Sequence, residues 1–237
     1  MWKGNQEMKL IARLYPSLAI LLLLAAPAFA QNQYRIEVFG GGNFPIDKDF
    51  LIGEPQFSPP MQGSHEYSQG VRGGVRFGVD FKKYWGEDII YSYGSNATRI
   101  INSTSGIEFP FTVKSHQFAV NALLYPGGAG EDSKVAPYVT AGVGATFFVI
   151  SPETVNAGLE SGLGNLHSEN VFAFNAGGGI RARVSRRIGI RVDVRDYMTR
   201  PPRFGLPEKS DDPDAIVFPA SGVFHQIEAS FAVVFYF

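Results

Sequence analysis

The chain has 237 residues, of which 45% are hydrophobic, 14% aromatic and 18% charged, and its formal net charge is -1. The hydrophobic share excludes a disordered chain, and the small net charge provides no field that would recruit nucleic acid. Cysteine is absent, which excludes disulfide scaffolds, thiolate metal sites and cysteine nucleophiles.

The first thirty residues predict a secretory signal peptide. Basic residues precede the apolar run 18–26, and residues 28–30 read Ala-Phe-Ala. A basic segment, a short apolar run and an A-x-A site in this order are typical of a cleaved signal, and the run is shorter than the roughly 20 residues of a membrane-spanning helix. We therefore expect residues 1–30 to be removed and residues 31–237 to form one domain.

The remaining chain alternates between apolar and polar residues. In residues 71–81 the odd positions carry valine, glycine and phenylalanine, whereas the even positions carry arginine, glycine and aspartate. Successive side chains of a strand point to opposite faces, so this period of two predicts a strand with one apolar face. The same pattern predicts eight strands, over residues 34–43, 71–81, 88–95, 116–125, 138–149, 172–184, 188–195 and 226–237.

The predicted connections alternate in length. Long polar segments are expected at 45–69, 97–115, 150–170 and 199–222, and shorter ones at 82–87, 126–136 and 185–187. Long outer loops and short periplasmic turns are typical of up-and-down membrane barrels. The sequence therefore predicts an all-β fold, an eight-stranded antiparallel up-and-down transmembrane β-barrel.

Aromatic residues near the predicted strand ends fit the interfacial girdles of such a barrel, where rings lie at the depth of the lipid headgroups. These residues are Tyr34, Phe44, Tyr84, Trp85, Tyr125, Tyr138, Tyr197, Tyr236 and Phe237.

The last predicted strand carries a family resemblance. Phe231, Val233, Phe235 and Phe237 alternate up to the final aromatic residue, and this pattern resembles the C-terminal insertion signal of Gram-negative outer-membrane barrels. The domain as a whole resembles the small eight-stranded barrels of the OmpA-like and opacity-type surface antigens. The resemblance implies a monomer in the cell outer membrane that is inserted by the barrel assembly machinery and contacts outer-membrane lipids and lipopolysaccharide.

Strand parity places eleven charged residues inside this barrel, and eight strands leave an interior just wide enough for side chains to fill. We interpret the set as a plug of ion pairs, because unpaired buried charge is costly, with Asp193 beside Arg191 or Arg195. Asp80 is expected beside Arg35 of the neighbouring strand. The alternative is an anion pathway that uses the surplus of basic residues. The set is Arg35, Glu37, Arg72, Arg76, Asp80, Arg181, Arg183, Arg191, Asp193, Arg195 and Glu228.

Few residues suggest catalysis or metal binding. None of the four histidines is followed by serine two positions later, the spacing that would place a His-Ser pair on one strand face; they are His65, His116, His167 and His225. A divalent cation could lie at Asp211, Asp212 and Asp214, but we interpret these residues as a solvated acidic loop. We expect no catalytic residue, metal or cofactor.

The sequence thus predicts a non-enzymatic outer-membrane barrel with a structural or surface-interaction role through its extracellular loops, and no nucleic-acid partner. Two alternatives remain open. One is a narrow pore or small-solute conduit, motivated by the arginine-lined interior. The other is a lipid A-modifying enzyme, motivated only by barrel size and the four histidines.

Overall fold

The fold is taken from a computed structural model of the chain. It describes residues 32–46, 50–52, 63–81, 83–102, 108–129, 133–160, 165–209, 211, 217–218 and 222–237. The predicted signal peptide lies outside these residues and stays a prediction.

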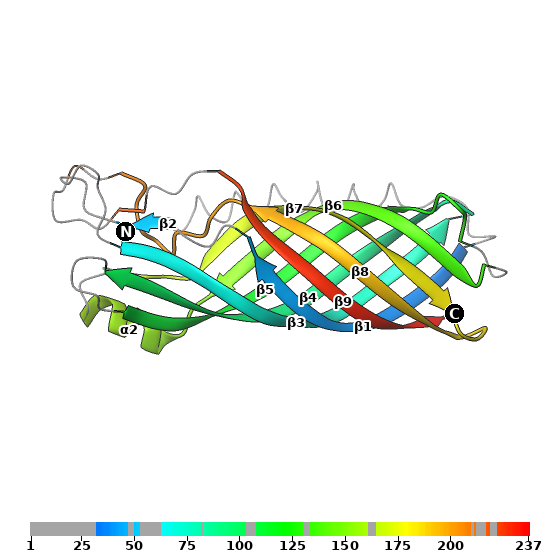
Figure 1. The fold of residues 1–237 in the computed structure, drawn as a ribbon, viewed down its shortest axis with the longest axis horizontal. Helices are drawn as coiled ribbons and strands as arrows, with labels where there is room; N and C mark the ends of the chain where they lie inside the picture. Colours follow the sequence, from blue (N-terminus) through cyan, green and yellow to red (C-terminus); the bar gives the residue numbers. More distant parts are fainter. Residues whose placement is uncertain are drawn as a thin grey trace, which may run out of the picture. The chain divides into compact units, whose positions relative to one another are not determined.

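Eight long antiparallel strands follow one another around a closed barrel (Figure 1). Each strand pairs with the next in sequence, and β1 pairs with both β9 and β3, which closes the sheet. The short strand β2 (Phe50–Ile52) pairs with the start of β3. This arrangement confirms the predicted eight-stranded antiparallel barrel. The long strands are β1 (Asn32–Pro45), β3 (Gly63–Phe81), β4 (Trp85–Asn102), β5 (Glu108–Leu124), β6 (Val135–Val149), β7 (Glu169–Arg183), β8 (Ile188–Thr199) and β9 (Phe224–Tyr236).

The two faces of each strand follow the period of two. On β5, Gln117 and Asn121 are buried in the interior, whereas Phe118 and Val120 point outward with 50% and 37% of their surface exposed. Apolar side chains therefore cover the outside, and polar side chains fill much of the inside. This is the reverse of a soluble protein, in which the apolar face would be buried.

Strands β4 and β5 are longer than predicted. Residues 97–115, expected as a long loop, are mostly strand, and only residues 103–107 separate β4 from β5. Several outward positions here are polar, as at Arg99 and Thr112, so the regular apolar alternation on which the prediction relied stops before the strand does. Long and short connections also do not alternate strictly along the chain. The β5–β6 connection 125–134, predicted as short, is longer than the 103–107 connection.

The segment expected as a loop at 150–170 contains the helix α2 (Pro152–Glu160). The Ser151 hydroxyl accepts a hydrogen bond from the Thr154 backbone N–H at 3.3 Å, and Pro152 occupies the first turn, where its missing N–H costs nothing. No helix among the described residues is long and apolar enough to cross a membrane.

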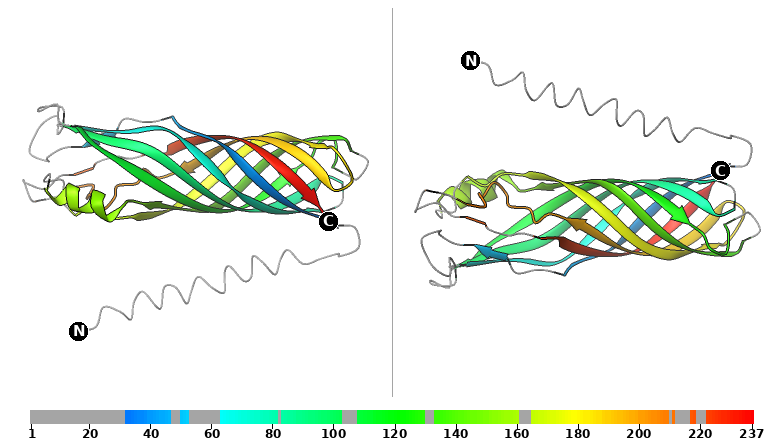
Figure 2. Two further views of the ribbon diagram at one scale, coloured as in Figure 1. Left: turned by 90° about the horizontal axis from the view of Figure 1, so that it is seen from below. Right: turned by 90° about the horizontal axis from the view of Figure 1, so that it is seen from above.

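The two ends of the barrel differ. One end, here called the turn end, holds the start of β1, the end of β9, and residues 83–84 and 184–187 (Figures 1 and 2). The opposite end, here called the loop end, holds α2 and the segment that follows β8 (Figure 2).

The barrel interior as candidate functional site

An ion-pair network begins near the turn end, around Arg35 on β1. Its Nε donates to Glu37 Oε1 at 3.0 Å, and its two terminal nitrogens pair with Asp80 of β3 and Asp88 of β4. The second oxygen of Asp80 accepts from Arg181 of β7 at 2.6 Å. Four strands are thereby joined across the interior.

The next layer is centred on Arg191 of β8. Its Nη1 lies 2.9 Å from Glu37 Oε1 and 3.0 Å from Asp88 Oδ2, and its Nη2 lies 3.1 Å from Asp193. Asp193 also accepts from Arg195 Nε at 2.6 Å. These five side chains are completely or almost completely buried.

Toward the middle of the barrel, Glu228 of β9 accepts from Arg76 Nη2 at 3.3 Å and lies 3.6 Å from Arg72 Nη1. Arg72 also donates to Gln117 at 2.9 Å and to Gln226 at 3.2 Å. A buried guanidinium needs several carboxylate or amide partners, because a charge taken from water without partners is strongly destabilising.

The structure changes the charge balance of the interior. Asp88, which the sequence reasoning missed, is a full member of the network, whereas Arg183 lies at the turn end, donates to Gln33 and stacks 4.0 Å over the Tyr236 ring. The connected set is six arginines and five carboxylates: Arg35, Arg72, Arg76, Arg181, Arg191 and Arg195 with Glu37, Asp80, Asp88, Asp193 and Glu228. The surplus of basic residues that motivated an anion pathway is nearly gone.

Tyrosines close the network at the turn end. Tyr125 donates its hydroxyl to Asp80 at 2.9 Å, and Tyr138 donates to Asp193 while accepting from Arg191 Nε at 2.6 Å. The girdle prediction was therefore wrong for Tyr125, Tyr138, Tyr197 and Tyr236, which are at most 5% exposed. These tyrosines have the parity of the inward residues. Their rings and hydroxyls are therefore buried inside the barrel and do not lie at the membrane interface.

The loop end of the interior is filled by an apolar cluster, here called the apolar cap. Inward side chains from the outer parts of β3, β4, β5, β6, β7 and β9 meet side chains from the segments after β6 and β8. Its buried members are Tyr67, Ile100, Phe111, Val113, Phe148, Ile150, Leu166, Val171, Phe204, Leu206, Phe218 and Phe224. This cap was not predicted from the sequence, because Phe111 and Val113 lie in a stretch predicted as a loop.

Comparison with known proteins identifies the family. The sequence matches the family described as outer membrane protein beta-barrel domain over residues 17–224. The chain belongs to this family. It therefore lies in the cell outer membrane. Because short turns face the periplasm and longer loops face outward in such barrels, we expect the turn end to face the periplasm and the loop end to face outward. No curated protein matches the sequence.

The chain is similar to solved structures of outer-membrane proteins, and the match to OprG shows the same fold. OprG from Pseudomonas aeruginosa is 10% identical, with a TM-score of 0.58 over 87% of this chain and 96% of OprG. Outer membrane protein W of E. coli is 16% identical, with a TM-score of 0.43 over 89% of this chain and all of that protein. Neisserial surface protein A is 12% identical, with a TM-score of 0.45 over 86% of this chain and 97% of that protein.

The outward face of this outer-membrane barrel carries a band of apolar side chains. On β8 the outward positions from 188 to 194 are isoleucine or valine and are 38–54% exposed. Asp196 follows on the same face, with its Oδ2 2.6 Å from His225 Nδ1 of β9. A transmembrane strand needs about 9–11 residues, so this polar pair marks the outer border of the hydrocarbon region. At the periplasmic border, Tyr84 and Trp85 remain exposed on the outside, where amphipathic rings are expected.

The other sequence-predicted candidates are dispersed. His116 points outward and bonds through Nδ1 to the Tyr91 hydroxyl at 2.9 Å, whereas His167 is exposed beyond β6. The side chain of His65 and the residues Asp212 and Asp214 lie outside what the structure describes. Among the described residues, no three histidine, aspartate or glutamate side chains come together in a way that could hold a metal ion.

The insertion signal occupies the outward face of β9 as its alternation predicts. Phe231, Phe235 and Phe237 are 51%, 39% and 74% exposed, and Val233 is 36% exposed. Recognition of these residues by the assembly machinery stays a prediction.

Proposed function

We propose that this outer-membrane barrel acts at the cell surface through its loop end, with an interior that serves stability rather than passage of solutes. The observation that carries the proposal is the filling of the interior along its length. Tyrosines and the ion network occupy the periplasmic half, and the apolar cap occupies the outer end.

A solute path would need space or exchangeable water at every level. Arg35, Arg76, Arg191 and Arg195 are completely buried, and each engages at least two carboxylates. Moving one of these guanidinium groups aside would break at least two buried ion pairs at once, which is unfavourable in the interior. The interior is thus built to stay closed.

The outward histidines do not support a lipid-modifying enzyme. A serine-based lipid hydrolase needs a histidine within hydrogen-bond reach of its nucleophile. His116 bonds to the Tyr91 hydroxyl, and His225 bonds to Asp196. Neither contact activates a serine, so we propose a non-enzymatic role.

The loop end offers exposed groups for an interaction. The β4–β5 hairpin extends beyond the apolar band and presents Arg99, which lies 2.6 Å from Glu66 and 3.7 Å from Glu108. The helix α2 packs against the apolar cap through Val155 and presents Leu159, which is 53% exposed. Charged and apolar groups are therefore displayed on supports that are anchored in the barrel.

Surface binding is tested with bacteria that produce the protein or a variant in which residues 152–160 are replaced by a glycine-serine linker. We measure adherence to immobilised lipopolysaccharide, to epithelial cell layers and between the bacteria themselves. The proposal expects at least one of these to rise with the natural protein and to fall with the variant. The matched control replaces the periplasmic turn 185–187 and should leave adherence unchanged.

Two outcomes would contradict this function. Adherence that is the same with and without the protein on all three surfaces removes the surface role. A change in the lipid A mass spectrum when the protein is produced would support the enzyme alternative instead.

A further inference from the structure

We propose that the outer wall of the barrel binds lipid A, the phosphorylated and acylated anchor of lipopolysaccharide, in a groove between the outer ends of β6, β7 and β8. The site opens on the lipid-facing wall, and the buried side chains of Val171, Asn175 and Thr199 also line it. It would hold one lipid in a fixed position rather than move it.

The groove arises because β8 ends early beside β7. The outermost pair between these strands is Ala173 with Thr199, but β7 continues along β6 as far as Glu169, which is opposite Phe148. Two prolines follow Arg200. Proline lacks the N–H that a sheet ladder needs, so the chain cannot continue beside residues 169–172.

After the prolines the chain turns over the interior instead of rising along the wall. The backbone N–H groups of Arg203 and Phe204 donate to Glu169 Oε2 at 2.5 and 3.0 Å, and Phe204 is buried in the apolar cap. A groove is left on the outside of the barrel. Val223, just before β9, borders it on the side away from β7.

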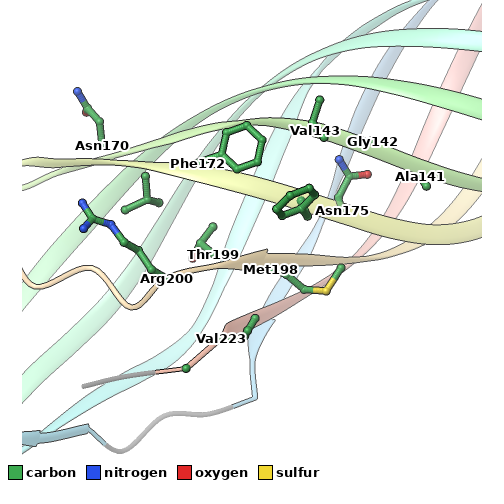
Figure 3. A pocket seen from close by; sticks show the side chains of 13 residues that line it. Ala141, Gly142, Val143, Asn170, Phe172, Asn175, Met198, Thr199, Arg200 and Val223 are labelled. Carbon is green, nitrogen blue, oxygen red and sulfur yellow. The ribbon is translucent and has the colours of Figure 1, made fainter. Parts of the chain in front are cut away.

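This groove has a volume of about 1030 Å³, and the part nearer the turn end is apolar (Figure 3). Phe172 and Phe174 of β7 are 57% and 56% exposed, and their rings pack edge to face at 4.9 Å. Val143 of β6 and Met198 of β8 lie on either side, opposite Phe174 in register. These side chains suit an acyl chain, because burying apolar surface against them is favourable and requires no polar partner.

The outer end of the groove is polar. Asn170 and Arg200 are both at that end of the groove (Figure 3), and the Arg200 side chain is 58% exposed. Its Nη2 contacts Glu169 at 2.8 Å, and a guanidinium carries five N–H donors in a fork that matches phosphate geometry. The edge of β7 at residues 169–172 also needs polar partners, because hydrocarbon cannot satisfy backbone groups.

Polarity and depth together select the ligand. In the β7–β8 register, Phe174 and Met198 lie one outward position beyond Asp196, at the outer edge of the apolar band, and Arg200 lies one outward position further out. A ligand for this groove must have an acyl chain pointing inward and an anionic group at the outer surface. In the outer leaflet of an outer membrane that combination is lipid A.

The test uses full-length mature protein refolded without lipid into detergent and then mixed with lipid A or phosphatidylethanolamine. Native mass spectrometry measures the fraction of protein that retains lipid after dilution. We expect retention of one lipid A per barrel. Val143→Trp fills the groove, and Arg200→Gln removes the charge; each should weaken retention by about tenfold, the loss expected for one charge-assisted hydrogen bond or one filled subsite.

Matched controls separate the site from general effects. Val192→Trp adds the same ring on the outward face of β8 away from the groove, and Arg99→Gln removes an exposed arginine at the outer end; neither should change retention. Lipid A without phosphate should bind the natural protein and the Arg200→Gln variant alike. Folding of each variant is checked by its heat-dependent gel migration.

Equal retention by the natural protein and the folded Val143→Trp variant would overturn the proposal. So would equal retention of lipid A and phosphatidylethanolamine by the natural protein. Both results leave the adherence test of the surface function untouched, since the groove variants do not alter the loop end.

Discussion

At the scale of single residues, carboxylates shared between arginines hold the interior together. Asp88 pairs with Arg35, lies 3.0 Å from Arg191 and lies 3.6 Å from Arg195. Three strands depend on this one side chain. Removal of one partner from a buried ion pair is more damaging than removal of the whole pair, because a buried charge then lacks compensation.

We therefore predict that Asp88→Asn lowers the free energy of unfolding by about 3–5 kcal/mol, the usual cost of breaking a buried pair. Urea unfolding in detergent micelles, followed by tryptophan fluorescence, measures the change. Glu87→Gln is the matched control: the neighbouring side chain is only half-buried on the opposite face of the strand, and we expect a change within about 0.5 kcal/mol. Equal effects of the two substitutions would show that the network does not stabilise the barrel.

A glycine on β7 makes room for another part of the network. A Cβ at Gly179 would come within 2.4 Å of the Tyr138 hydroxyl and 2.2 Å of the Val192 carbonyl oxygen. Tyr138 uses that space to reach Asp193 and Arg191.

Gly179→Ala should accordingly destabilise the barrel by about 1–3 kcal/mol through overpacking. Gly40→Ala provides the comparison, because a Cβ at Gly40 meets no atom within 4 Å and should leave stability almost unchanged. Thermal unfolding of both variants in the same detergent tests the difference, and an unaffected Gly179→Ala would contradict this account of the packing.

At the scale of elements, the strands extend unequally beyond the membrane. The β4–β5 hairpin reaches outward to Asn102 and Glu108, whereas β8 stops at Thr199. The long hairpin carries exposed charge above the bilayer, and the short strand leaves the groove in the wall. The loop end is thus shaped by where strand pairing stops.

The orientation of these elements is testable because the natural chain has no cysteine. In intact cells, a membrane-impermeant maleimide should label Glu108→Cys at the outer end of β5. Arg186→Cys, in the exposed turn between β7 and β8, should be labelled only after the outer membrane is permeabilised. Labelling of Arg186→Cys in intact cells, with Glu108→Cys protected, would reverse the assigned orientation.

The eight strands could be predicted because lipid requires apolar side chains at every second position of each membrane-spanning strand. Parity alone also places Arg35, Asp80 and Asp193 inside. The extensions of β4 and β5 could not be predicted in this way, since their outward residues leave the bilayer and lose the apolar constraint. Asp88 was recoverable: it is the first residue of a predicted strand and shares the inward parity of Ser92.

Other features depend on contacts distant in sequence. Phe204 and Phe218 lie in a proline-rich segment without alternation, and only the folded chain brings them to Phe111 and Phe148 in the apolar cap. The groove has a local signal, the two prolines after Arg200, but its meaning requires the register between β7 and β8. The residue at which a strand stops pairing is set by its neighbouring strands, not by the strand itself.

At the scale of the whole molecule, the barrel has three regions. The wall meets lipid, the interior contains the ion network and the apolar cap, and we propose that the loop end meets the surroundings of the cell. Surface activity and a closed interior are compatible, because a rigid barrel holds the loop end in place without having to open.

The most direct test of the closed interior is single-channel recording of the refolded natural protein in planar lipid bilayers, with insertion checked independently by protease protection. The account predicts no stepwise conductance at moderate voltage in concentrated salt, because the ion network and the apolar cap occupy the interior among the described residues. Reproducible ohmic steps that scale with the amount of inserted protein would contradict it.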